Sequence, residues 1–156
     1  MRKATLLLLI AGLFAATLPA GADMGLDEVR QATAPFRSVA NAEAAGYEAF
    51  LECHENPGVG GMGQHYVDFA ALDGIVEATH PEAMVYEVGA NGSLKLVAVE
   101  YLVPAELVDP ENPPSLFGQE FHPHATLPVW ILHAWIWKAN PAGTFQDWNP
   151  NVGRCS

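Results

Sequence analysis

The hydrophobic pattern divides the chain into a helical first part and a strand-rich second part. In the second part, apolar and polar residues alternate with a period of two, which places successive side chains on opposite faces of a β-strand. This alternation recurs in residues 47–53, 64–70, 84–103 and 127–137. Asn91 and Gly92 divide the third run, and this pair favours a two-residue turn, so the run predicts a β-hairpin.

The helical part covers residues 26–47 and contains its own start and stop signals. Asp27 is a residue type that caps a helix N-terminus, and Pro35 interrupts any single straight helix through the segment. Ser38 can cap a second helix, which we expect to end before Gly46, a residue typical of helix C-termini. Two short helices are therefore predicted.

Two segments lack a regular period. Residues 57–63 contain four glycines and are predicted to form a flexible loop, whereas residues 104–128 form a long proline-rich excursion. Long loops in small domains are usually functional or mobile. The order of elements predicts an α+β fold with short N-terminal helices followed by an antiparallel sheet, which could roll into a small barrel.

The N-terminus has the pattern of a secretory signal peptide. Arg2 and Lys3 precede an apolar stretch from Thr5 to Leu18, and Ala20-Gly21-Ala22 has the small residues of a cleavage site. We expect residues 1–22 to be removed and residues 23–156 to form a single domain with a turn-rich C-terminal tail, secreted or periplasmic and free of the membrane. An uncleaved membrane anchor is the alternative, but the apolar run is short of the roughly 20 residues that a spanning helix needs.

Charge and cysteine content narrow the function. With 18 acidic against 7 basic residues the chain has a net charge of −11, which disfavours nucleic acid and anionic lipid as partners. Cys53 and Cys155 are expected to form a disulfide in an oxidising compartment, although two thiols or a thiolate ligand remain alternatives. Residues 50–54 lack the first cysteine of a haem attachment motif, which excludes covalent haem.

Three ligand-type side chains fall on otherwise apolar strand faces. Glu100 shares a face with Leu96, Ala98 and Leu102. His133 shares one with Ile131, Trp135 and Trp137. His65 shares one with Val67 and Phe69 and follows the glycine-rich segment, where backbone, solvent or a ligand can approach closely. A buried carboxylate is costly unless it is paired or binds a cation.

These three residues predict a metal site at His65, Glu100 and His133. Two imidazoles and one carboxylate with an open position are the ligands of catalytic zinc and of non-haem iron, and zinc or copper fits the ligand types better than iron. In an enzyme, a metal-bound water would carry the chemistry. Each residue also has a plain structural interpretation, namely a hydrogen-bonded core histidine or a glutamate at a sheet edge.

Three further histidines are additional candidate ligands. His122 and His124 form a His-x-His pair in the proline-rich segment, and His54 follows Cys53, whereas His80 precedes Pro81 as in an ordinary turn. The alternative function is a metal-free module that binds a small molecule in an aromatic-lined cleft. Four tryptophans lie in residues 130–148, where they serve either as a stacking wall or as aromatic core.

Several blocks of the chain resemble a family of secreted bacterial proteins with no settled activity. The blocks are "AAGYEAFLEC", "GGMGQHYVD", "PEAMVYE", "NGSLKLVAVEYLVP", "LFGQEFH" and "LHAWIWKANPAGTFQDWNP", and they span residues 33–151. The resemblance implies no reaction. It implies that His65, Glu100 and His133 are motif positions.

Overall fold

The computed structural model describes residues 21–153 and Cys155. The signal peptide predicted for residues 1–22 therefore lies almost entirely outside the described residues. The helices are α1 (Gly21–Thr33), η1 (Ala34–Arg37), α2 (Val39–Ala44), η2 (Phe69–Ala71) and η3 (Ala105–Leu107). The strands are β1 (Glu48–Asn56), β2 (Gly60–Val67), β3 (Ala83–Val88), β4 (Leu94–Pro104), β5 (Ser115–Leu116), β6 (Gln119–Glu120), β7 (His122–Pro123) and β8 (Val129–Ala134).

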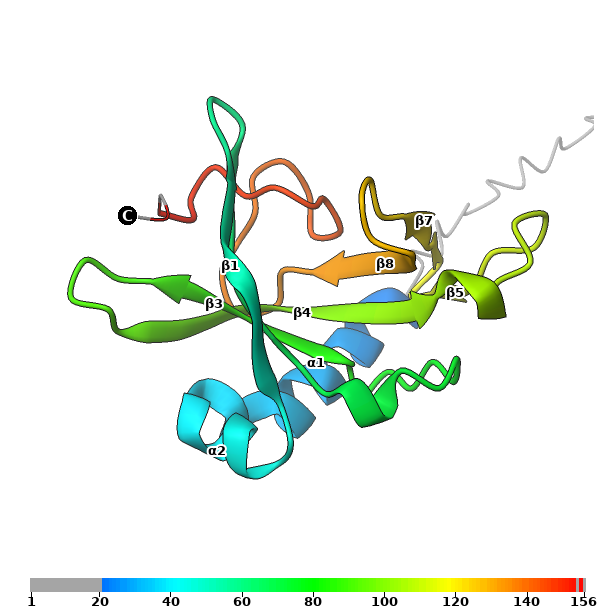
Figure 1. Ribbon diagram of the computed structural model, residues 1–156, viewed down its shortest axis with the longest axis horizontal. Coiled ribbons are helices and arrows are strands. Elements are labelled where there is room, and N and C mark those ends of the chain that lie inside the picture. Colours follow the sequence, from blue (N-terminus) through cyan, green and yellow to red (C-terminus); the bar gives the residue numbers. More distant parts are fainter. Residues whose placement is uncertain (1–20, 154, 156) are drawn as a thin grey trace, which may run out of the picture.

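The α+β fold is confirmed, with helices first and an antiparallel sheet after them. Six strands pair antiparallel in the order β1-β2-β3-β4-β8-β7, and β5 and β6 form a separate two-stranded ribbon. The main sheet curls into a half-barrel, with β1 and β7 as its edges, and does not close (Figure 1).

The N-terminal helices follow the prediction at Pro35 and differ from it at their caps. Pro35 lies in η1, which separates α1 from α2, and Gly46 ends the second helix with a φ of 103°. The prediction that Asp27 caps the first helix is wrong, because α1 begins at Gly21 and Asp27 instead pairs with Arg30 along the helix. Ser38 occupies the N-cap of α2 without a side-chain hydrogen bond.

The two faces of the sheet have different coverings. One face packs on the helices, where Val29 of α1 and Ala42 of α2 contact a core that includes Met84, Tyr86 and Tyr101. In Figure 1 the helix α2 lies below β3 and β4, and the C-terminal tail, orange to red, lies above them. The opposite face carries two smaller apolar clusters, and the functional candidates lie on this second face.

The β3–β4 hairpin forms, but its register differs from the prediction. Val88 pairs with Leu94, and Gly89 donates its N–H to the carbonyl of Ser93, so the turn is longer than the two residues expected. The partners also shift between Val85, which pairs with Ala98, and Tyr86, which pairs with Leu96. This bulge turns Leu96 into the helix-facing core, so its predicted place on the face of Glu100 is wrong.

The glycine-rich segment is mostly strand, which corrects the prediction of a loop over residues 57–63. Only the start of the segment turns, and β2 begins at Gly60. A Cβ on Gly60 would lie 2.5 Å from the backbone of Asn149, and Gly63 has a φ of 112°. Gly60 and Gly61 are needed because the tail backbone packs directly on β2, where Gly61 and Asn149 exchange hydrogen bonds, whereas Gly63 lies against the backbone of Tyr86 in β3. Close approach of backbone was among the predicted reasons for these glycines.

The disulfide between Cys53 and Cys155 is confirmed and links β1 to the end of the tail. The proline-rich segment 104–128 contains η3 and the short strands β5, β6 and β7, so it is more regular than predicted. Within residues 21–153, no helix combines the length and the apolar character needed to cross a membrane.

Candidate metal centre

Strand pairing places His65, Glu100 and His133 on one face of the sheet. Glu100 of β4 lies directly opposite His133 of β8, and Ala83 of β3 lies opposite Glu100 on its other side. His65 of β2 pairs with Val85, two residues further along β3, and directly opposed residues share a face. The predicted orientation of all three side chains is therefore correct.

The three side chains also converge. Glu100 lies between the two histidines, with Oε2 3.3 Å from Nε2 of His65 and Oε1 3.3 Å from Nδ1 of His133. One ligand atom from each of the three residues lies within 4.8 Å of the others, and the two imidazole rings meet edge to face. The two 3.3 Å distances suit a single ion, since metal–ligand bonds of about 2 Å bring ligand atoms roughly 3–4 Å apart.

His133 is the least satisfied of the three. Its side chain is 0% exposed, and both ring nitrogens are buried without a hydrogen-bond partner among the described residues. The 3.3 Å approach to Glu100 lacks the geometry of a hydrogen bond, and the ring stacks on Trp135. Buried polar atoms are nearly always paired, because an unpaired one costs about 1–3 kcal/mol. The orphaned nitrogens disagree with a hydrogen-bonded core histidine.

Burial controls the ionisation of the cluster. It lowers the pKa of His65 to about 4, with contributions from His54 and His124, and it lowers the pKa of His133 well below the usual 6.5. Burial, together with Asp147 and Glu82, raises the pKa of Glu100 to about 8. The imidazoles are therefore neutral at pH 7, the form in which histidine binds metal. A bound cation would favour the ionised form of Glu100.

Asp147 is a member of the site that the sequence did not reveal. Its Oδ1 lies 3.8 Å from Nδ1 of His133 and 3.1 Å from Nε2 of His122. Asp147 belongs to the irregular tail, where no strand alternation predicts the direction of a side chain. Its position in the aromatic block "GTFQDWNP" was the only sequence signal that could have indicated it.

The additional candidate histidines surround the cluster without joining it. His122 of β7 pairs with Asp147, and Nδ1 of His124 accepts the backbone N–H groups of Thr126 and Leu127. His54 of β1 stacks on Trp148 of the tail. Each of these three histidines lies close enough to lower the pKa of His65 or His133. His80 is exposed beside Glu77, as a turn residue should be.

Trp135 and Trp137 lie beyond the end of β8 and pack in different places. β8 ends at Ala134, so the alternation that placed Trp135 and Trp137 on one face with His133 does not continue, and that prediction is wrong for Trp137. Trp135 packs near His133, whereas Nε1 of Trp137 donates to Thr33 of α1 on the helix side of the sheet. The tryptophans serve mainly as core and tail anchors.

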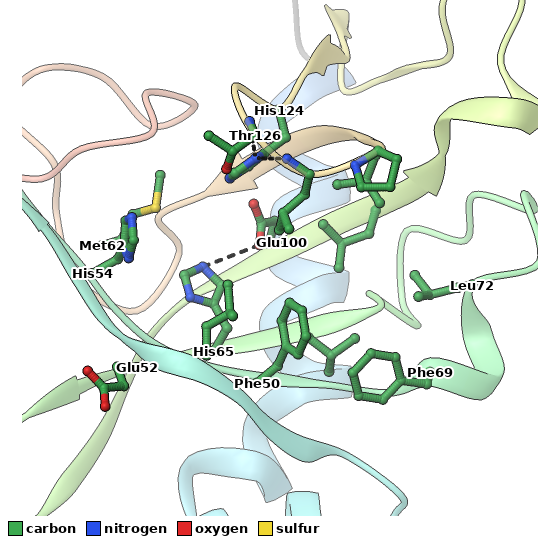
Figure 2. A pocket seen from close by; sticks show the side chains of 16 residues that line it. Phe50, Glu52, His54, Met62, His65, Phe69, Leu72, Glu100, His124 and Thr126 are labelled. Atoms are coloured by element: carbon green, nitrogen blue, oxygen red, sulfur yellow. Dashed lines mark hydrogen bonds and ion pairs between the residues drawn. The ribbon is translucent and has the colours of Figure 1, made fainter.

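A cavity of about 170 Å³ opens onto the cluster (Figure 2). His65 and Glu100 line it, whereas His133 does not, so His133 lies behind them. Most of the remaining lining is apolar. A metal ion held by the three residues would therefore sit on the floor of the cavity with an open position facing it, an arrangement that allows a second ligand to reach the ion.

Comparisons with known proteins do not assign the chain to a family. A scan of family models finds no match to the chain, and searches of curated proteins and of solved structures find none either.

Proposed function

We propose that this chain is a secreted or periplasmic protein that binds one transition metal ion, zinc or copper, through His65, Glu100 and His133. The proposal rests on the convergence of these three side chains, together with the buried Nδ1 of His133, which has no hydrogen-bond partner among the described residues. A buried ring nitrogen in a metal-free core is expected to have a hydrogen-bond partner, and a metal ion would supply one to Nδ1 of His133, whereas Nε2 has none within the described part of the chain in either state.

The chemistry of the donor set supports zinc or copper. Two neutral imidazoles and one carboxylate suit both ions, and copper binds nitrogen and oxygen sites more tightly than other first-row divalent metals. Asp147 adds a second carboxylate beside the cluster, with Oδ1 3.8 Å from Nδ1 of His133. Because Asp147 approaches the same nitrogen that would bind the metal, its negative charge would favour a cation at that atom.

The disulfide supports the proposed location, since such bonds persist in oxidising compartments. The resemblance to secreted bacterial proteins and the signal-peptide pattern of residues 1–22 agree with it.

The test is metal analysis of the secreted protein purified without chelator. We expect about one equivalent of zinc or copper, and a loss of affinity of more than about 100-fold in His65→Ala and in His133→Ala, since removal of a ligand costs more than removal of its outer-shell partner. His80→Ala is the matched control, because His80 is exposed and belongs neither to the cluster nor to the lining of the cavity, and this variant should bind metal as the wild type does. A folded wild type that binds neither ion would refute the proposal.

A further inference from the structure

The cavity above the cluster has an apolar body and a polar floor. Its walls come from β1, β2, η2, β4, the start of β8 and the segment that precedes it, and they include Phe50, Val67, Phe69, Leu102 and Val129. The rings of Phe50 and Phe69 lie 5.4 Å apart and meet edge to face along one wall. Figure 2 shows these two rings on one side of the cavity, with Glu100 and His65 between them and His124.

The size of the cavity limits what can enter it. Cavities of about 150 Å³ with aliphatic and aromatic walls accommodate benzene, so the 170 Å³ here holds a body of about one ring. A second ring, a sugar unit with its many hydroxyls, or a peptide segment would exceed the space or leave polar groups unpaired.

The polar end of the cavity selects for an anionic oxygen. Two neutral imidazoles and one carboxylate would leave a divalent ion with a net positive charge on the cavity floor. His124 adds a hydrogen-bond donor, because its Nδ1 accepts two backbone N–H groups and its proton must therefore lie on Nε2. The only carboxylate of the lining besides Glu100 is Glu52, whose side chain points away from the cavity in Figure 2.

The entrance is apolar as well. Leu51 is 58% exposed and Phe69 is 48% exposed, and both residues line the cavity. Leu51 also has a φ of 56°, a conformation that non-glycine residues rarely adopt and that concentrates at ligand sites. Exposed apolar side chains at the rim of an apolar cavity suit an apolar ligand that passes them on entry.

We propose that the cavity binds a small monocarboxylate with a compact apolar or aromatic body, whose carboxylate takes the open position of the metal. The inference rests on the proposed metal site. The carboxylate contacts the ion and the Nε2 proton of His124, and the apolar body lies against Phe50, Phe69 and Val129.

The test uses the zinc-loaded protein and three probes that separate the contribution of the charged head group from that of the apolar ring. Benzoate has both parts, acetate has the head alone, and benzylammonium has the ring with a cationic head. We expect benzoate to bind at least about tenfold more tightly than acetate, because the ring leaves water for an apolar cavity, and benzylammonium not to bind. Binding is measured by calorimetry, and the zinc content is measured before and after each titration.

Four variants test whether benzoate binds in this cavity. Val129→Phe should fill the cavity and lower benzoate affinity at least about tenfold while the protein keeps its zinc, and Leu127→Trp provides a second filling variant. Val59→Phe, on an exposed turn outside the cavity, is the matched control and should bind benzoate as the wild type does. His133→Leu, behind the cavity, should lose benzoate binding together with zinc.

The outcomes distinguish the two proposals. Equal affinities for benzoate and acetate, or benzoate binding that survives both filling variants or the loss of zinc in His133→Leu, would overturn the carboxylate inference and leave the metal site intact. A wild type that takes up no zinc would overturn the metal site and this inference with it.

Discussion

Replacement of His133 by leucine should have opposite effects on stability with and without metal. In the metal-free protein both ring nitrogens of His133 are buried and unpaired, and each such atom costs about 1–3 kcal/mol. Leucine has a similar volume and no polar atoms, but it loses the stacking on Trp135, which is worth about 1 kcal/mol. In chelator, His133→Leu should therefore be more stable than the wild type by about 1–5 kcal/mol.

The order reverses when metal is added. A ligand that binds only the folded state stabilises it by about 4 kcal/mol when its concentration is 1,000 times its Kd. Wild type should gain this stabilisation with zinc or copper, whereas His133→Leu should gain little.

Urea denaturation of both proteins, in chelator and in excess metal, measures the four free energies of unfolding. A His133→Leu protein that is destabilised by several kcal/mol in chelator would show that the imidazole has partners in the metal-free core. A wild-type stability that does not respond to metal would refute the reasoning altogether.

Three further predictions concern the surroundings of the site. Replacing Cys53 and Cys155 by serine should lower the free energy of unfolding by about 4 kcal/mol, because the disulfide closes a loop with a sequence separation of 102, and a loss below about 1 kcal/mol in urea would contradict this. Burial raises the pKa of Glu82 from 4.5 to about 7, so protonated Glu82 stabilises the fold below pH 4.5 and its contribution of about 3 kcal/mol disappears as the pH rises through 7. Glu82→Gln should flatten this part of the pH profile in chelator, and an unchanged profile would count against the assignment. Asp147→Asn removes a negative charge 3.8 Å from Nδ1 of His133 and should weaken metal binding at least about tenfold by competition assay, and an unchanged affinity would exclude an electrostatic role for Asp147.

The sequence was sufficient for the fold class and for the orientation of the three central residues. His65, Glu100 and His133 each lie within a strand of regular alternation, so the period of two gave the correct face for each. Their convergence required more, because it depends on which strands are neighbours. The adjacency of β4 and β8 brings Glu100 opposite His133 across the sheet, and a connection of 24 residues between these strands does not reveal it.

The errors occur where regular alternation stops. A bulge in β4 moved Leu96 to the other face, and the end of β8 at Ala134 freed Trp137 to pack on α1. Glycine content suggested a loop before His65, whereas Gly60 and Gly61 lie in a strand and make room for the backbone of the tail. Asp147 lies on that tail, whose path is fixed by tertiary contacts and by the disulfide rather than by any local pattern.

Anomalous diffraction from crystals of the zinc-loaded protein tests the central claim most directly, because it locates the ion. The account predicts a single strong peak at the floor of the cavity, about 2.0–2.2 Å from Nε2 of His65, an oxygen of Glu100 and Nδ1 of His133. A zinc-loaded crystal with no peak between these three side chains, or with its peak at other residues, would contradict the account.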